Sequence, residues 1–408
     1  MSLLPVSDAL ERLLGNAAPV TAVEDVPLHA ANGRVLAADL SAKLTQPPFD
    51  ASAMDGYALR AEDAVNNGTE LRVIGESAAG RGFSGTVGAG ETARIFTGAP
   101  VPNGADTILI QEDAERLDGN RIRTAFVPLK GRHIRPRGQD FAENEVVLKA
   151  GTRLDYAMLT VAAAMNHAKV SVFRKPLVAI LATGDELVEP GTIPGSGQIV
   201  ASNTFGIAAL ARDCGAEIID LGIVADDRAA IAAAVDRAIA AGADVLVTLG
   251  GASVGDHDLV QMALTQAGMQ LDFWRIAMRP GKPLMVGSLG PMQVLGLPGN
   301  PVSTLVCGLL FLEPLLSTLA RRPRPQRQAF ARTATALKAN DHRQDHLRAR
   351  LRRDTDGNLI AESFGTQDSS MMNIFAQSDC LILRPANDPE RQAGDTCPIL
   401  LLRPFPGE

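Results

Sequence analysis

The chain has 408 residues, a formal net charge of −7 and an aromatic content of 4%. At roughly 100–200 residues per domain, this length predicts two to four domains. The acidic balance and the scarcity of aromatic side chains argue against a nucleic-acid-binding protein, which needs a basic surface and stacking platforms.

The first half of the chain combines helical segments with a β-rich region. Apolar residues at helical spacing predict helices over residues 7–15 and 154–167, and the run KVSVFRKP after the second helix predicts a strand. Between residues 44 and 141, short extended runs alternate with Gly and Pro; they are LRVIG, ARIFTG, DTILIQE and NRIRTAF. This alternation predicts a compact β-rich domain.

From about residue 176, strand-like runs such as PLVAILATG and ADVLVTLGG alternate with helical segments, which predicts βαβ units and a parallel sheet. The last helix of this region, residues 302–320, has broad apolar faces and is expected to be mostly buried. Beyond the boundary RRPRPQR (321–327), short strands and the hairpin signal Asp356-Gly357 predict a small β domain.

These patterns predict a multidomain α/β plus β protein. We expect a central parallel α/β domain, a β-rich domain inserted near the N-terminus and a small β domain at the C-terminus. The predicted boundaries are 1–43 with 142–172 for an N-terminal helical and linker domain, 44–141 for the β-rich domain, 173–324 for the α/β domain and 325–408 for the C-terminal domain.

The cysteines and the hydropathy pattern bear on the cellular compartment. Cys214, Cys307, Cys380 and Cys397 are dispersed, without the spacing of a zinc site. This pattern predicts reduced thiols in a cytoplasm rather than a disulfide framework. Because no uninterrupted apolar run reaches the roughly 18 residues that a membrane span needs, none is expected.

Four polar loops follow the predicted parallel strands: ATGDE (182–186), ADD (225–227), GGASVGDHD (250–258) and LPGNPVS (297–303). In an open α/β sheet, ligands bind beyond the carboxyl ends of the strands. Glycines there free backbone N–H groups to hold an anion, and carboxylates beside a phosphate imply a divalent cation, for which magnesium is the candidate. The alternative is that these aspartates only cap loops and helices.

The segment RIAMRPGKP (275–283) carries Arg275, Arg279 and Lys282, which could bind phosphate or another tetrahedral oxyanion; a charged turn is the alternative. The motifs GxxxxGK[ST] and GxGxxG are absent. The chain is therefore predicted to be neither a P-loop NTPase nor a nicotinamide dehydrogenase.

Two further signals are weaker. GASVG (251–255) fits the GxSxG pattern of a serine hydrolase with Ser253 as nucleophile, but Gly255 and Asp256 interrupt the helix that this motif requires. In the first half, the loops PPFDASAMDGYA (47–58), RIFTGAPVPNGAD (94–106) and RPRGQD (135–140) are candidate ligand loops, with structural turns as the alternative.

Seven of these segments, in chain order, resemble the MoeA-type molybdopterin molybdenumtransferase family, whose relatives include the E domain of gephyrin; the segments are PPFDASAMDGYA, IFTGAPVPNGAD, RPRGQD, ATGDEL, GGASVGDHD, RPGKP and LPGNPVS. The resemblance implies an elongated homodimer with four domains per subunit. It also implies that the α/β domain is related to the enzyme that adenylylates molybdopterin, and that the active cleft is shared between subunits.

The resemblance further implies the reaction. Adenylylated molybdopterin would be the substrate, molybdate would supply the metal, and AMP would leave in the presence of magnesium. The molybdopterin adenylyltransferase and apo-molybdoenzymes are the expected protein partners. The sequence leaves open tungstate as the oxyanion, and a dimeric scaffold or carrier of the same fold without catalysis.

Matching positions carry the family's site residues. The implied catalytic residues are Asp55, Thr97, Asp140, Glu186, Asp227 and Asp258, of which Glu186, Asp227 and Asp258 would hold magnesium. The implied binding residues are Arg137, Gly250, Gly251, Ser253, Arg279, Lys282, Pro298, Pro301, Arg348 and Ser369.

The chain departs from the family pattern at four positions. Ala51 and Ala201 stand where Asn and Asp are common, and Arg275 and Arg279 stand where many members have Lys. An Arg keeps the positive charge, but its planar fork differs in geometry from the point charge of a Lys.

Overall fold

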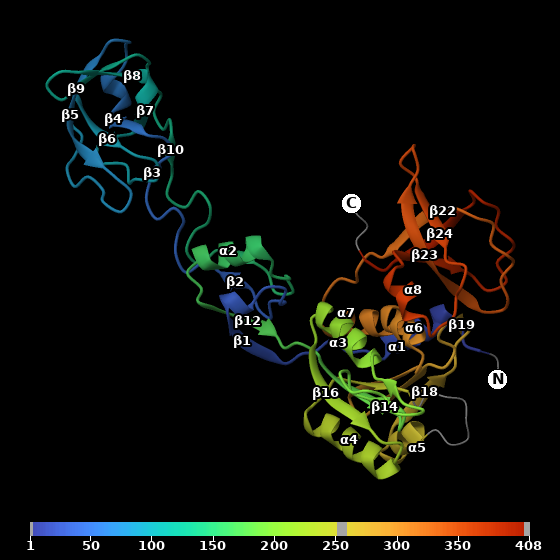
Figure 1. Cartoon of the computed structure of the whole chain (residues 1–408). Helices are drawn as coiled ribbons and strands as arrows, with labels where there is room; N and C mark the ends of the chain where they lie inside the picture. The colour runs from blue at the N-terminus through green and yellow to red at the C-terminus, as the bar shows by residue number, and fades with distance from the viewer. Residues whose placement is uncertain (1–2, 251–258, 404–408) are drawn as a thin grey trace. The chain divides into compact units, whose positions relative to one another are not determined.

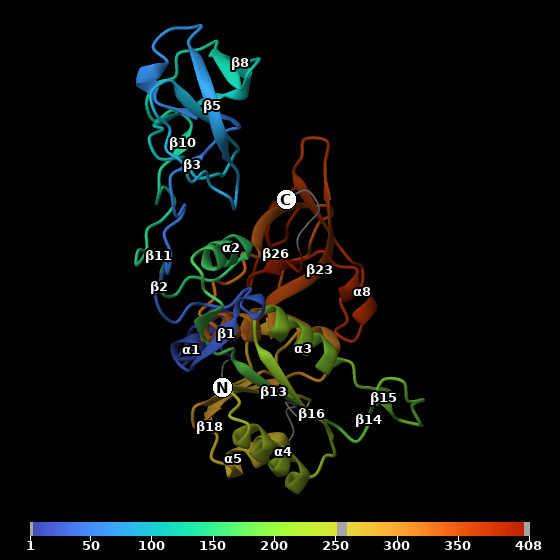
Figure 2. The same ribbon diagram turned by 90° about the vertical axis from the view of Figure 1, so that its left-hand side faces the viewer.

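The computed structural model describes residues 3–250 and 259–403, and the chain divides into two compact units (Figures 1 and 2). Unit 1 comprises Met1–Val23 and Phe173–Glu408, and unit 2 comprises Glu24–Val172. Each unit has its own buried apolar core. The predicted multidomain α/β plus β class is confirmed.

Unit 2 contains a six-stranded sheet with the strand order β7-β4-β6-β5-β9-β8. Its strands are β4 (Gly56–Leu59), β5 (Glu70–Ser77), β6 (Glu91–Ile95), β7 (Thr107–Ile110), β8 (Ala114–Leu117) and β9 (Arg121–Thr124). The four runs predicted as strands form β5, β6, β7 and β9. The sequence analysis missed β4 and β8, which are short and lie beside polar turns.

The rest of unit 2 is a helix with three two-stranded ladders. Helix α2 (Tyr156–Ala164) begins where the Asp155 side chain accepts hydrogen bonds from the backbone N–H groups of Ala157 and Met158. The ladders pair β1 (Val23–Pro27) with β12 (Lys169–Phe173), β2 (Leu40–Ser41) with β11 (Val146–Leu148), and β3 (Ala51–Ser52) with β10 (Ile134–Arg135). Short 3-10 turns are η1 (Leu28–Ala30), η2 (Ala61–Asp63) and η3 (Gln111–Asp113).

Unit 1 contains the predicted α/β sheet, with the strand order β16-β13-β17-β21-β20-β18. The strands are β13 (Leu177–Thr183), β16 (Glu217–Val224), β17 (Val245–Leu249), β18 (Gln270–Trp274), β20 (Met285–Leu289) and β21 (Met292–Leu297). The first four strands in this order are parallel to one another. Strand β20 pairs antiparallel with β21, and β18 pairs antiparallel with β20. A small parallel pair, β14 (Leu187–Val188) and β15 (Ile199–Val200), follows β13.

Helices cover both faces of this sheet because successive strand residues point to opposite sides. Val178 and Ile180 face one core with α1 (Val6–Gly15), α3 (Asn203–Asp213) and the helix formed by α6 (Pro301–Cys307), the π-helical turn η4 (Gly308–Leu312) and α7 (Glu313–Leu319). Ala179 and Leu181 face a second core with α4 (Arg228–Ala240) and α5 (Leu259–Gln266).

The helix Pro301–Leu319 is, among the described residues, long and apolar enough by length and composition to cross a membrane. However, 72% of its apolar window is buried inside the protein, as in the core helix of a globular domain. Its burial agrees with the expectation from its broad apolar faces.

The C-terminal part of unit 1 is a small β-barrel. Its strands are β22 (Gln328–Thr333), β23 (Gln344–Arg353), β24 (Leu359–Ser363), β25 (Cys380–Arg384) and β26 (Thr396–Leu401), accompanied by α8 (Met372–Ala376). The additional pairing of β23 with β25 closes the sheet on itself. The predicted hairpin at Asp356-Gly357 joins β23 to β24, and β19 (Met278–Arg279) reaches from the α/β part to pair with β23.

The N-terminal helix packs with the α/β sheet rather than with the segment that follows it. Ala9 and Leu13 are fully buried in the same core as α7, and the backbone N–H of Ala277 donates to the carbonyl of Leu4 at 2.7 Å. The structure thus puts Met1–Val23 into unit 1, whereas the sequence grouped residues 1–43 together. The division into four domains stays a prediction.

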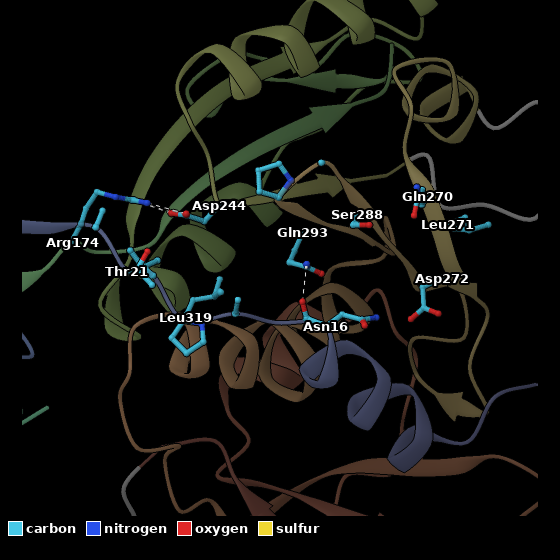
Figure 3. Close-up of a pocket in the computed structure, with 16 residues that line it drawn as sticks. Asn16, Thr21, Arg174, Asp244, Gln270, Leu271, Asp272, Ser288, Gln293 and Leu319 are labelled. Atoms are coloured by element: carbon cyan, nitrogen blue, oxygen red, sulfur yellow. Dashed lines mark hydrogen bonds and ion pairs between the residues drawn. The ribbon is translucent and has the colours of Figure 1, made fainter.

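A cavity of about 720 Å³ lies at the amino ends of the parallel strands (Figure 3). Its charged groups are already paired: Arg174 forms two hydrogen bonds of 2.9 Å with Asp244, and Asp272 is bound by Arg12. Because it lies at the amino ends of the strands, the cavity is at the opposite edge of the sheet from the predicted ligand loops, which follow the carboxyl ends.

The burial of Leu13 predicts a measurable loss of stability. Leu13→Ala should lower the free energy of unfolding of unit 1 by about 2–5 kcal/mol, because it opens a cavity between α1 and the sheet. Trp274, the only tryptophan, lies in β18 and reports on this unit by fluorescence in urea. Leu36→Ala in unit 2 is the matched control, and an unchanged midpoint for Leu13→Ala would contradict the packing of α1.

Candidate functional site

The carboxyl ends of β16, β13, β17 and β21 carry the four predicted ligand loops. Strand β13 lies between β16 and β17, so the chain leaves β13 to one side and returns on the other. This reversal makes the gap between the ends of β13 and β17 a topological switch point, where ligands bind in doubly wound sheets.

Two glycines shape the backbone at this switch point. Gly184 has φ +148°, and a Cβ there would lie 2.5 Å from an oxygen of the Glu186 carboxylate. Gly250 has φ +95°, and a Cβ there would lie 2.8 Å from the carbonyl oxygen of Thr183. Both positions therefore require glycine. Beside them, the buried hydroxyls of Thr183 and Thr248 have no hydrogen-bond partner among the described residues.

Carboxylates crowd together at the ends of β13 and β16. The backbone N–H of Asp226 donates to Oδ1 of Asp185 at 3.1 Å. Burial raises the pKa of Asp226, and the negative charges of Asp185 and Glu186 raise it further. A cation would relieve this repulsion.

Asp227 has a different local role. Its Oδ1 accepts a hydrogen bond of 2.9 Å from the backbone N–H of Ala230, so it is the N-cap of α4. Within residues 3–250 and 259–403, no group of three or more acidic, His or Cys side chains forms a complete metal site. Three other predicted residues, Gly251, Ser253 and Asp258, lie outside the described residues, as does the whole GASVG motif.

The loop after β21 meets a loop of the barrel. Pro301 occupies the first turn of α6. The side chain of Asn300 donates to Oγ of Ser369 at 2.9 Å, and the backbone N–H of Val302 donates to the Ser369 carbonyl at 3.0 Å. This contact involves the segment that carries three predicted binding residues. Pro298 is buried, and Pro301 and Ser369 are half-buried.

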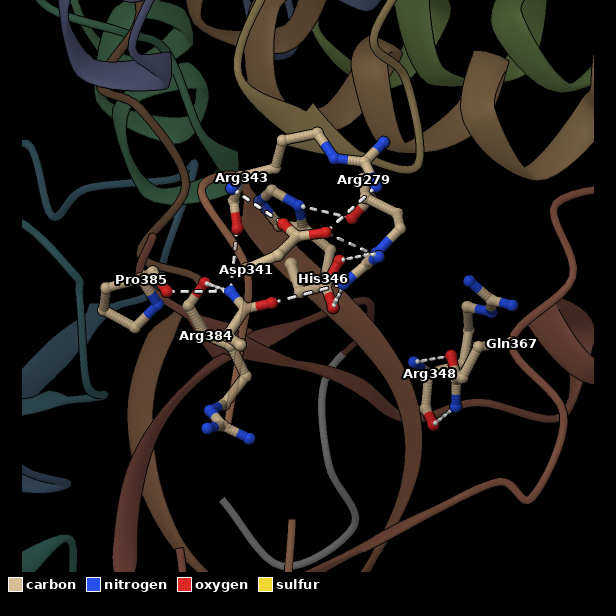
Figure 4. A network of polar contacts seen from close by, with 10 residues as sticks. Arg279, Asp341, Arg343, His346, Arg348, Gln367, Arg384 and Pro385 are labelled. Carbon is tan, nitrogen blue, oxygen red and sulfur yellow. Dashed lines mark hydrogen bonds and ion pairs between the residues drawn. The ribbon is translucent and has the colours of Figure 1, made fainter. Parts of the chain in front are cut away.

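Arg348, on β23 of the barrel, is 1% exposed, yet within the described part of the chain it forms no ion pair. Its Nη2 donates to the carbonyl of Asp368 at 3.0 Å, and its Nε has no partner among the described residues. The side chain of Gln367 accepts a hydrogen bond of 2.8 Å from the backbone N–H of Arg348 and donates one of 3.1 Å to its carbonyl (Figure 4). Burial lowers the pKa of Arg348, and the negative charges of Asp368 and Asp345 only partly offset this effect.

Arg279 is, by contrast, fully engaged. Its Nε and Nη2 donate to the two carboxylate oxygens of Asp345 at 2.5 Å, its Nη1 donates to Asp341 at 3.1 Å, and its Nη2 also reaches Asn340 at 3.2 Å (Figure 4). The hydrogen bonds to Asp345 raise the pKa of Arg279 above its ordinary value. Lys282, three residues further on, is exposed.

Unit 2 holds the remaining predicted residues. Oδ1 of Asp55 accepts hydrogen bonds from the backbone N–H and the hydroxyl of Thr97, both at 2.7 Å, and these bonds lower the pKa of Asp55. The backbone N–H of Arg137 donates to Asp50 at 2.7 Å. Asp140 is exposed, and its backbone N–H is bonded to the carbonyl of Gln46.

The sequence analysis did not assign roles to several residues of this site. Asp341 and Asp345, which bind Arg279, and Gln367, which holds Arg348, were missed. The only sequence signal was the acidic pair within the Arg-rich stretch DHRQDHLRAR. Asp226 was noticed among the loop acids, but Asp227 was preferred as a metal ligand.

Family descriptions match almost the whole chain. Residues 4–166 match the MoeA N-terminal region (domain I and II), residues 179–318 match a probable molybdopterin binding domain, and residues 331–402 match the MoeA C-terminal region (domain IV).

Relatives at full length agree with these matches. A molybdopterin molybdenumtransferase of Haemophilus influenzae is 35% identical over 97% of this chain and 98% of its own length. One from a Nostoc species is 36% identical over 93% of this chain and 88% of its own length. The crystal structure of a molybdopterin biosynthesis MoeA protein from Pyrococcus horikosii superposes with a TM-score of 0.83 at 30% identity, covering 99% of this chain and 100% of that one. The chain therefore belongs to the MoeA-type molybdopterin molybdenumtransferase family.

Proposed function

We propose that this chain inserts molybdenum from molybdate into adenylylated molybdopterin and releases AMP. One observation carries the proposal for this chain's own residues. Arg348 is a buried guanidinium that forms no ion pair among the described residues and whose Nε has no hydrogen-bond partner there, although the charges of Asp368 and Asp345 act on it from further away. Burying a charge without a counterion is unfavourable, so the site is arranged to receive an anion.

The oxyanion would bind at the junction of the barrel and the α/β sheet. Arg348 offers an unused N–H donor, Ser369 offers a hydroxyl two residues from Gln367, and the exposed Lys282 adds a positive charge from the α/β side. A tetrahedral dianion needs both charge and several donors. Tungstate has the same shape and charge as molybdate, so the site chemistry accommodates both.

The nucleotide-linked phosphates would bind at the switch point. Gly184 and Gly250 allow close approach to the backbone, and the hydroxyls of Thr183 and Thr248 are available as donors. The described residues form no complete metal site, but magnesium takes only one or two carboxylates together with phosphate oxygens, and Asp185, Glu186 or Asp226 could supply these carboxylates. When bound there, magnesium would neutralise charge that develops on the phosphoanhydride.

The residues of unit 2 are proposed as a second substrate-binding surface. Asp55 is held ionised and in place by Thr97, and the backbone of Arg137 is fixed by Asp50. Asp140 is exposed in the same unit. We further propose, from the family resemblance, a cytoplasmic homodimer that meets the molybdopterin adenylyltransferase and apo-molybdoenzymes.

The reaction is tested by incubating the protein with adenylylated molybdopterin and magnesium, with and without molybdate, and following AMP by chromatography. We expect release of AMP that molybdate stimulates, and a product that reconstitutes an apo-molybdoenzyme. Binding of the substrate without any release would instead indicate a scaffold or carrier.

The role of Arg348 predicts an unusual pair of effects. Arg348→Met keeps a flexible, unbranched side chain of about the size of the aliphatic part of Arg, but it removes the buried guanidinium, which forms no ion pair among the described residues. We expect loss of the molybdate stimulation together with a thermal midpoint that is unchanged or higher, because an apolar side chain suits a buried position better than an unpaired cation. Calorimetry and the AMP assay measure the two effects, and a normal molybdate response would exclude Arg348 from the site.

The roles of the neighbouring Asp226 and Asp227 can be distinguished by substitution. Asp226→Asn should raise the magnesium concentration needed for AMP release several-fold, since it removes a crowded carboxylate. Asp227→Ala should lower the free energy of unfolding by about 1 kcal/mol through loss of the α4 cap, whereas Asp227→Asn retains the cap. If Asp227→Asn raised the magnesium requirement as much as Asp226→Asn, Asp227 would be the metal ligand after all.

A further inference from the structure

The pairing of Arg279 with Asp345 joins the two parts of unit 1. Strand β19 comes from the α/β part, and its Arg279 is in register with Asp345 on β23 of the barrel. Besides the side-chain contacts, the backbone N–H of Gln344 donates to the carbonyl of Ala277 at 2.8 Å. His346, 1% exposed, lies with Nδ1 3.3 Å from the carbonyl oxygen of Arg279. Gln344, Asp345 and His346 of β23 therefore all contact the short segment 277–279.

The charges of this cluster cancel. Arg279 and Arg343 carry two positive charges, and Asp341 and Asp345 carry two negative ones, all within ion-pair distance. Asp345 is 7% exposed, so moving Arg279 away would leave a buried carboxylate without its partner. The cluster thus has little positive charge to offer an oxyanion, unlike Arg348, which lies three residues along the same strand.

We propose that Asp345 and Arg279 are positioning residues, which fix β23 so that Arg348 faces the loops of the α/β sheet, and that Arg279 is not itself a ligand of the oxyanion. The proposal rests on the proposed function, because it assigns the oxyanion to Arg348. The planar fork of Arg279 matches both oxygens of Asp345, which a Lys could not do.

The sign of the change in molybdate affinity tests the assignment. Asp345→Asn makes the cluster more positive, so simple electrostatics and the ligand hypothesis both expect tighter binding of molybdate. We expect weaker binding by about tenfold, which corresponds to about 1.4 kcal/mol, because Arg348 is displaced. Equilibrium dialysis with molybdate measures the dissociation constant. Tighter or unchanged binding by a folded Asp345→Asn protein would overturn the proposal.

Three further variants complete the experiment. Asp341→Asn is the matched control: it makes the same charge change in the same cluster, but Asp341 is 40% exposed and makes one 3.1 Å bond to Arg279, so binding should stay within about twofold. Arg279→Gln should weaken molybdate binding as much as Asp345→Asn. The double variant Arg279→Gln with Asp345→Asn should bind molybdate no more weakly than either single variant, because each single substitution already removes the contact between these two side chains. Additive or opposite effects would identify Arg279 as a ligand.

Amide hydrogen exchange gives a readout that does not need molybdate. Exchange over residues 276–281 and 343–349 should accelerate in Asp345→Asn and in Arg279→Gln, but not in Asp341→Asn. Unchanged exchange in both variants would reject the positioning role. A wild-type protein that bound no molybdate would instead reject the proposed oxyanion site, and the exchange data would still decide whether the pair holds β23.

Discussion

A buried guanidinium that forms no ion pair within residues 3–250 and 259–403 is the constraint on which the proposed site of unit 1 depends. The guanidinium of Arg348 has lost its hydration, and the carbonyl of Asp368 only partly replaces it. Gln367 bonds the backbone of Arg348 and not its side chain. Such a charge is tolerated when the surrounding fold is stable enough to hold it. The barrel supplies that stability, because the pairing of β23 with β25 closes it and leaves β23 hydrogen-bonded along its length.

The contrast between Arg348 and Arg279 shows that burial alone does not identify an anion ligand. Arg279 carries the same charge and is less buried, with 43% of its side chain exposed, but it is matched by two carboxylates. Its neutralised charge contributes to holding two parts of unit 1 together. Arg348 forms no ion pair among the described residues, and we therefore propose it, rather than Arg279, as the ligand of the oxyanion.

The sequence predicted what depends on local patterns and missed what depends on distant partners. Apolar strands alternating with helices identified the α/β sheet, and Asp356-Gly357 identified the hairpin. Strands β4 and β8 are short and lie beside turn residues, so their periodicity was weak. The ion pair between Arg279 and Asp345 spans 66 positions, and only the pairing of β19 with β23 creates it. Asp227 was assigned as a metal ligand from the family resemblance and stays a prediction; its role as the cap of α4 is seen only in the structure.

The loop carboxylates at the ends of β13 and β16 and the guanidinium of Arg348 occupy separate elements of unit 1, and this separation has a physical reason. If the carboxylates of Asp185 and Asp226 lay beside Arg348, they would pair with it and leave neither an anion site nor a cation site. Instead the acids lie at the ends of β13 and β16, while Arg348 lies in the barrel, and the contact of Asn300 with Ser369 joins the two regions. Under the proposed function, a substrate with both phosphate and an incoming oxyanion would meet a cation at one end and carboxylates at the other, so the charge pattern favours an extended anionic substrate over a single small anion.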